Sequence, residues 1–143
     1  MVSLDNRTYA SVLDRLKAAG LRPTRQRLAL AKLLLERGPR HVTAEDLFHE
    51  ARGIGIAISL ATIYNTLHQF TSAGLLREVV VDMGQSYFDT NTSHHHHFFD
   101  EATGDLVDIA AHEVEISRLP EAPEGAQIER VEVIVRLRRT ADA

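Results

Sequence analysis

The sequence contains no cysteine, and this absence removes several kinds of chemistry at once. It excludes disulfides, thiolate zinc sites and catalytic thiols, so any bound metal must be held by nitrogen and oxygen ligands. The sequence also has no apolar run of the roughly 18 residues that a membrane span needs. Its first residues carry acidic side chains where a secretory signal has a basic region and an apolar core. We therefore expect a cytoplasmic protein with no membrane partner.

The chain has 143 residues, which is enough for one domain or two small ones but too few for a large barrel enzyme. Its net charge of −4 conceals two unlike halves. Residues 1–81 hold eleven Lys and Arg against seven Asp and Glu, a charge of +4, whereas residues 82–143 hold five against thirteen, a charge of −8. This asymmetry indicates a phosphate-facing part followed by a cation-facing part.

The first half reads as helices followed by a hairpin. Helical spacing of apolar residues is found in four segments that end at glycine: residues 7–20, 24–38, 43–53 and 59–74. Thr24, Thr43 and Ser59 are suited to cap three of them. Residues 75–90 then read as two β-strands joined by a turn at 82–84. A helical bundle followed directly by a two-stranded wing predicts a winged helix-turn-helix.

The second half predicts a smaller unit. We expect a strand at residues 105–110, a helix at 111–119, a loop at 120–126 and a strand at 128–139. Because these elements are too few to bury a core alone, we expect a homodimer. The predicted fold class is α+β, with an N-terminal winged helix-turn-helix DNA-binding domain (1–87) and a small α/β dimerisation domain (88–143).

Two groups of polar residues in the first half are suited to double-stranded DNA. Arginines can neutralise phosphates, and the polar face of a helix in the major groove can contact bases. A solvated face is the alternative, and the wing downstream weakens it. The predicted DNA-binding residues are Arg22, Arg25 and Arg27 before and within the second helix, and Thr62, Tyr64 and Asn65 on the recognition helix, residues 59–73.

Four consecutive histidines, His94 to His97, are the main chemical feature of the second half. In an extended segment alternate side chains share a face, so His95 and His97 point one way and His94 and His96 the other. A polar loop is the ordinary alternative. Mixed histidine and carboxylate sets suit Zn(II), Fe(II) or Mn(II), and imidazole is also a haem ligand. Nearby carboxylates belong to Asp89, Asp100, Asp105, Asp108, Glu113 and Glu115.

The residues together resemble the ferric uptake regulator superfamily. "AGLRPTRQRLALAKLL", "HVTAEDLF", "ISLATIYNTLHQFTSAGLL" and "YFDTNTSHHHHFF" follow one another in that family's order, from about Arg15 to Arg139. "SLATIYNTL", "SYFDTN", "DLVDI" and "VEVIVRLRR" are most similar to the iron response regulator branch. The resemblance implies a homodimeric transcriptional regulator and not an enzyme.

The resemblance also implies ligand sets. Residues matching the family's regulatory site are all able to bind a metal ion: His41, Asp89, His95, His97 and Asp108. A second, incomplete site matches His94, His96 and Glu115, because its fourth position falls near Arg138. The CxxC pairs that hold a structural zinc in relatives are absent, so no structural zinc held by four cysteines is expected.

From this resemblance we expect an iron- and haem-responsive repressor of iron-uptake and haem-biosynthesis genes whose operator binding is weakened by haem. The haem ligands would come from His94, His95, His96 and His97, because the cysteine motif of some relatives is missing. A Zn, Mn or peroxide sensor is the alternative within the family. A metal-dependent hydrolase is the alternative outside it, although the sequence has no HExxH and no phosphate-binding glycine loop.

Overall fold

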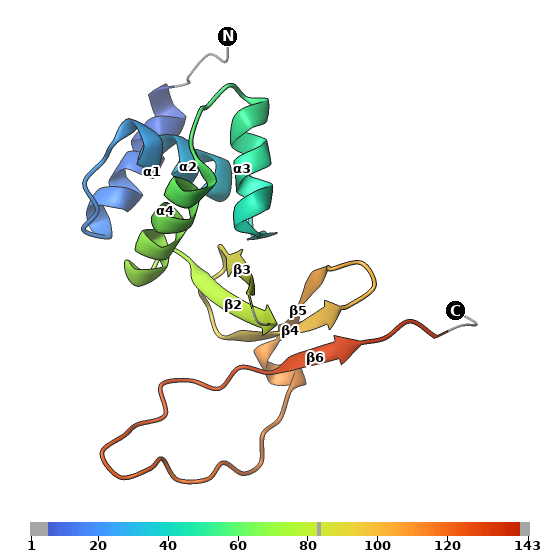
Figure 1. The fold of residues 1–143 in the computed structure, drawn as a ribbon. Helices are drawn as coiled ribbons and strands as arrows, with labels where there is room; N and C mark the ends of the chain where they lie inside the picture. Colours follow the sequence, from blue (N-terminus) through green and yellow to red (C-terminus); the bar gives the residue numbers. More distant parts are fainter. Residues whose placement is uncertain (1–5, 83, 141–143) are drawn as a thin grey trace. The chain divides into compact units, whose positions relative to one another are not determined.

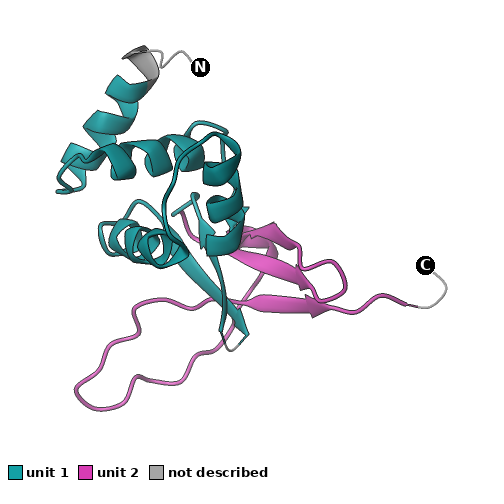
Figure 2. Cartoon of the chain, turned by 45° about the horizontal axis from the view of Figure 1, so that its top comes forward, with its two compact units in different colours: residues 1–92 teal, residues 93–143 magenta. Residues whose placement is uncertain are grey.

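A computed structural model describes residues 6–82 and 84–140 of the chain, which divides into two compact units. Residues 1–92 form the first unit and residues 93–143 the second (Figure 2). The sequence prediction placed the division after Tyr87. The strand that contains Tyr87 continues to Asp89 and pairs within the first unit, which extends that unit further along the chain. No helix in the described ranges is both long and apolar enough to cross a membrane.

Helices make up most of the first unit, as the sequence predicts (Figure 1). Their side-chain caps are the predicted ones: the hydroxyl oxygens of Thr24, Thr43 and Ser59 each accept a hydrogen bond from the backbone N–H three residues later. Thr43 and Asp46 form a reciprocal capping box. The helices are α1 (Asn6–Ala18), α2 (Arg25–Leu35), α3 (Ala44–Gly53) and α4 (Leu60–Ser72).

The core of the first unit lies where the apolar faces of these helices meet. Ile63, Leu67 and Phe70 of α4 are buried there, and Leu60 is partly buried against them. Phe88 of the hairpin packs in the same cluster. Burial of this many large aliphatic and aromatic side chains provides most of the unit's stability. The largest members of the cluster are Leu16, Leu30, Leu34, Leu47, Ile63, Leu67, Phe70 and Phe88.

The first unit also contains a three-stranded sheet with the order β1–β3–β2, and the hairpin predicted as the wing is part of it. The predicted hairpin is present as β2 (Arg77–Asp82) and β3 (Gln85–Asp89), which pair antiparallel. Gly84 has a φ of 77° in the connection, and Met83, also placed in the predicted turn, lies outside the described residues. The sequence did not predict the third strand, β1 (His41–Val42), which pairs antiparallel with β3.

The second unit contains a sheet with the order β5–β4–β6. Three residues of the histidine run, His95 to His97, lie in its central strand, β4 (His95–Asp100), and His94 directly precedes it. This strand pairs antiparallel with β5 (Leu106–Ala110) and parallel with β6 (Ile134–Leu137). The extended conformation expected for the run is therefore found at His95 to His97, in place of the alternative polar loop, and the predicted strand at residues 105–110 is confirmed.

Two predictions for the second unit are wrong. The helix expected at residues 111–119 is only one 3₁₀ turn, Ala111–Glu113, and the strand expected at 128–139 is limited to β6. The segment between them runs as a long irregular loop (Figure 1). Its apolar side chains Ile116, Leu119 and Ile128 are exposed. A short amphipathic helix forms stably only when its apolar face packs against a surface, and these side chains have no such cover.

Candidate functional site

The first unit brings His41 and Asp89 together. They are direct partners in the β1–β3 pairing, and the Nε2 atom of His41 lies 3.1 Å from Oδ2 of Asp89. The Asp89 side chain is buried, and its Oδ1 accepts a hydrogen bond from the backbone N–H of Asn91 at 2.9 Å. This hydrogen bond fixes the orientation of the carboxylate. The pairing of β1 with β3 places the imidazole of His41 beside it. We call His41 and Asp89 the first half-set.

The second unit brings His95, His97 and Asp108 together. His97 and Asp108 are direct partners in the β4–β5 pairing, and His95 follows the alternation of β4 onto the same face. The Nε2 atoms of both histidines lie 3.4 Å from Oδ1 of Asp108. Both imidazoles are buried whereas Asp108 is exposed, and the donor atoms of the three lie within 4.8 Å of one another. We call these residues the second half-set.

One ring nitrogen of His95, the first residue of β4, is held by the backbone. Nδ1 of His95 lies 2.6 Å from the carbonyl oxygen of Ser93. A carbonyl oxygen only accepts hydrogen bonds, so Nδ1 donates to it, and Nε2 is the ring nitrogen that faces Asp108. Metal-binding histidines are oriented by this kind of bond from the other ring nitrogen. The arrangement therefore fits a divalent cation.

Of the residues predicted for the second site, the structure brings two histidines together. The rings of His94 and His96 are adjacent, with centroids 5.0 Å apart, but Nδ1 of His96 accepts a hydrogen bond from the backbone N–H of Val133. In the described ranges, the groups of three or more candidate ligands do not include His94, His96 or Glu115. Glu115 lies just after the 3₁₀ turn, in the irregular segment, and is exposed. Of the four histidines in the run, only His94 is exposed.

Asp100 is one of the carboxylates near the histidine run, but its side chain binds other residues than the histidines. It is buried at the end of β4, where its side chain forms an ion pair with Arg139 and accepts a hydrogen bond from the Ala102 N–H at 3.0 Å. Burial acts to raise the pKa of Asp100, but these two interactions outweigh it and lower the pKa below its ordinary value of 3.8. Asp100 therefore links the end of β4, the central strand, to the residues that follow β6.

The three predicted arginines differ in their surroundings. Arg22 and Arg25 are exposed at the start of α2. Arg27 donates hydrogen bonds to the carbonyl oxygen of Arg22 at 2.8 Å and to Oε1 of Gln69 at 2.9 Å. Its guanidinium thus ties the start of α2 to α4, which a sequence pattern could not reveal because Gln69 is far along the chain.

Two of the three predicted residues on the polar face of α4 form hydrogen bonds within the protein. Asn65 is exposed, whereas the hydroxyl of Thr62 accepts a hydrogen bond from that of Ser59 at 2.8 Å. Tyr64 is half-buried and donates its hydroxyl to Oε1 of Glu45 at 3.1 Å. Burial, followed by this hydrogen bond and the charge of Glu45, raises the pKa of Tyr64 above its ordinary value of 10.0, so the hydroxyl is a neutral donor at pH 7.

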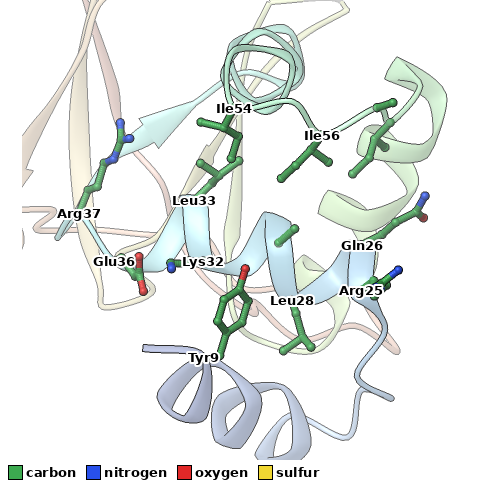
Figure 3. Close-up of a pocket in the computed structure, with 13 residues that line it drawn as sticks. Tyr9, Arg25, Gln26, Leu28, Lys32, Leu33, Glu36, Arg37, Ile54 and Ile56 are labelled. Atoms are coloured by element: carbon green, nitrogen blue, oxygen red, sulfur yellow. The ribbon is translucent and has the colours of Figure 1, made fainter. Parts of the chain in front are cut away.

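A separate apolar groove of about 840 Å³ lies in the first unit. Figure 3 shows the side chains of α1, α2 and the segment after α3 that line it, including Tyr9, Leu28 and Ile56. Two of the lining residues form a cation–π contact, in which the ammonium of Lys32 lies over the Tyr9 ring, 4.6 Å from its centroid. Of the predicted site residues, only Arg25 lines this groove.

Comparisons of the sequence and of the structure with known proteins point to the same family. The model of the ferric uptake regulator family matches residues 18–136. The ferric uptake regulation proteins of Vibrio parahaemolyticus and Escherichia coli K12 are 40% and 41% identical over 81 residues, 57% of this chain. The aligned part spans 54% and 55% of those proteins, about half of their length.

Solved structures extend the likeness over most of the chain. The ferric uptake regulator of Pseudomonas aeruginosa, solved with manganese, aligns with a TM-score of 0.69 and 25% identity, covering 89% of this chain and 96% of that one. The Vibrio cholerae ferric uptake regulator gives the same TM-score and identity over 88% and 98%. The predicted α+β fold is confirmed by these alignments.

Proposed function

Because the chain belongs to the ferric uptake regulator family, whose members are transcription regulators and not enzymes, we propose that it is a metal-responsive regulator that binds double-stranded DNA. The observation that carries this proposal is the pair of half-sets, each built by strand pairing from histidine and carboxylate side chains. Binding of DNA would place the protein in the cytoplasm.

We propose that His41, Asp89, His95, His97 and Asp108 ligate one Fe(II) or Mn(II) ion. Two ligands from one half-set and three from the other would give five, and a mixed nitrogen and oxygen set of this size favours Fe(II) or Mn(II) over tetrahedral Zn(II). Five residues, 90–94, separate Asp89 from His95, so their Cα atoms lie at most about 20 Å apart. A divalent cation supplies the positive charge that offsets the two carboxylates. The manganese in the P. aeruginosa structure supports this choice.

For DNA, we propose that α4 enters the major groove and that the β2–β3 hairpin acts as the wing. Asn65 is exposed on α4 and can bond to base edges, and Tyr64 lies beside it. Arg22 and Arg25 are exposed and can neutralise phosphates. Arg27 and Thr62, committed to hydrogen bonds within the protein, would position the other groups.

We propose that the protein acts as a homodimer through its second unit. Three strands bury few side chains, and several large apolar residues of this unit are exposed, as expected for a surface covered by a second copy. A two-fold dimer would read two operator half-sites. The exposed residues are Val107, Ile116, Leu119, Ile128, Val135 and Leu137.

An iron response regulator, in which haem weakens operator binding, is a second candidate. The observation that favours it is the exposed imidazole of His94 beside that of His96. The two candidates predict opposite signs, because a bound divalent cation adds positive charge to a protein that binds phosphates. A haem absorption band lost in His94→Ala, together with weaker DNA binding when haem is added, would favour the haem candidate.

The proposal is tested by incubating the purified protein with a pool of random-sequence DNA duplexes in the presence of Mn(II). We expect recovery of one sequence class with two related half-sites. Recovery of unrelated sequences at the background level would contradict a role in sequence-specific regulation.

A further inference from the structure

The side chain of His68 on α4 contacts two residues of the wing. Its ring meets that of Phe88 edge to face, with centroids 5.6 Å apart. Its Nδ1 atom lies 3.7 Å from Oε2 of Glu78, whose Oε1 accepts a hydrogen bond from the hydroxyl of Ser86 at 2.8 Å. Phe88 and Glu78 are direct partners in the β2–β3 pairing. His68 therefore rests on both strands of the wing at one level of the sheet.

The same strand also carries the carboxylate of the first half-set. Phe88 and Asp89 are consecutive residues of β3, so their side chains lie on opposite faces of the sheet. Asp89 meets His41 on one face, and Phe88 is fully buried in the core on the other. Cores are close-packed, so a shift of β3 at Asp89 is passed to whatever Phe88 touches.

His68 also contacts the DNA-facing part of α4. Its ring stacks on that of Tyr64 one turn earlier in the helix, with centroids 6.4 Å apart and planes 20° apart. The Tyr64 hydroxyl donates to Glu45 of α3, and Asn65 follows directly in the sequence. One imidazole thus lies between the strand that holds Asp89 and the side chains proposed to meet bases.

We propose that His68 is a positioning residue that couples the first half-set to the DNA-facing side of α4. This inference rests on the proposed function and adds a residue that is neither a metal ligand nor a base contact. The contacts from Asp89 through Phe88 and His68 to Tyr64 form a continuous path. Occupation of Asp89 would favour one placement of β3, and His68 would pass that preference to Tyr64.

A purely structural role fits the surroundings of His68 less well. Its side chain is 53% exposed, and α4 is anchored through its opposite face by Ile63, Leu67 and Phe70, which are all buried. Replacement of His68 should therefore leave folding largely intact. Its effect should be found in the dependence of DNA affinity on metal.

The test compares His68→Ala with His49→Ala, a matched control in which an exposed histidine at the edge of the Phe48 ring is removed from α3. The probe is a DNA duplex selected by the wild-type protein, and Kd is measured with and without Mn(II). We expect the ratio of the two Kd values to fall roughly 2- to 30-fold in His68→Ala. We expect it to stay at the wild-type value in His49→Ala.

Mn(II) binding without DNA separates positioning from ligation. His68→Ala should bind Mn(II) as wild type does, because both half-sets remain. A second variant, Glu78→Gln, keeps a partner for Ser86 while removing the charge that faces His68, and it should lower the same Kd ratio by a smaller factor. A wild-type ratio in His68→Ala, or equal losses in His68→Ala and His49→Ala, would overturn the inference. If the wild-type protein shows no Mn(II) dependence, the proposed function itself fails, and the inference fails with it.

Discussion

His41 and Asp89 are distant in the sequence yet directly opposed in the β1–β3 pairing, with Nε2 of the histidine 3.1 Å from Oδ2 of the carboxylate. The strand that carries Asp89 is also part of the wing hairpin beside α4. A ligand of the proposed metal therefore belongs to the same small sheet as the proposed wing. A metal ion held by Asp89 would therefore act directly on the hairpin that we propose as the wing.

Asp89→Asn tests the first half-set. The amide keeps the shape of the side chain but removes its charge, so we expect Mn(II) affinity to fall at least about tenfold in a calorimetric titration. Asp105→Asn is the matched control, because Asp105 is an exposed carboxylate outside both half-sets. Equal affinity for Mn(II) in Asp89→Asn and wild type would remove Asp89 from the site.

The alternation of the histidine run gives a second prediction. His97→Ala removes a donor of the second half-set and should weaken Mn(II) binding. His94→Ala, just before β4 and beside His96, should leave Mn(II) binding within about twofold of wild type. The measurement is the Mn(II) content of each purified variant, compared with that of the wild-type protein. Loss of metal from both variants alike would mean that the strand does not sort the run into two functions.

Substitution of Arg27 should change the stability of the fold, whereas substitution of Arg25 should change phosphate binding. Arg27→Ala removes hydrogen bonds to the Arg22 carbonyl and to Gln69, so we expect unfolding to become easier by about 1 kcal/mol in denaturant titration. Arg25→Ala should leave stability unchanged and reduce the slope of log K against log salt by about 1. The opposite pattern would reverse the roles assigned to the two arginines.

The lowered pKa of Asp100 predicts that the free energy of unfolding depends on pH. Because its pKa in the folded protein lies below the ordinary value of 3.8, its ion pair with Arg139 stabilises the fold fully above pH 3.8. That contribution is lost as the pH falls through the lowered pKa. Asp100→Asn should therefore have a lower Tm than wild type at pH 7, and the difference should shrink below pH 3.8.

The matched control for Asp100 is Glu101→Gln, which breaks the exposed ion pair with Arg136. Exposed pairs contribute little, so its Tm should stay close to wild type at every pH. A Tm difference for Asp100→Asn that persists unchanged under acid would show that the carboxylate charge is not the cause.

Local patterns in the sequence predicted the parts of the fold that local chemistry determines. Helix caps at Thr24, Thr43 and Ser59 and the hairpin that contains Phe88 follow from short-range bonds and from alternation. A two-residue strand such as β1 has no pattern of its own, because it exists only through pairing with Asp89 and its neighbour.

The remaining errors and omissions have the same origin in tertiary context. Residues 111–119 have the spacing of an amphipathic helix, but that spacing forms a helix only where a surface covers it. The five metal-site candidates came from a family resemblance, whereas the roles of Arg27 and His68 depend on Gln69, Glu78 and Phe88, which approach them only in the folded unit.

We propose above all that a metal ion at the two half-sets controls DNA affinity. Its most direct test is the Kd of a selected duplex measured against Mn(II) concentration for wild type and Asp89→Asn. We expect Mn(II) to tighten wild-type binding by roughly 5- to 150-fold and to leave the affinity of the variant unchanged. The same Kd for the wild-type protein with and without Mn(II) would contradict it.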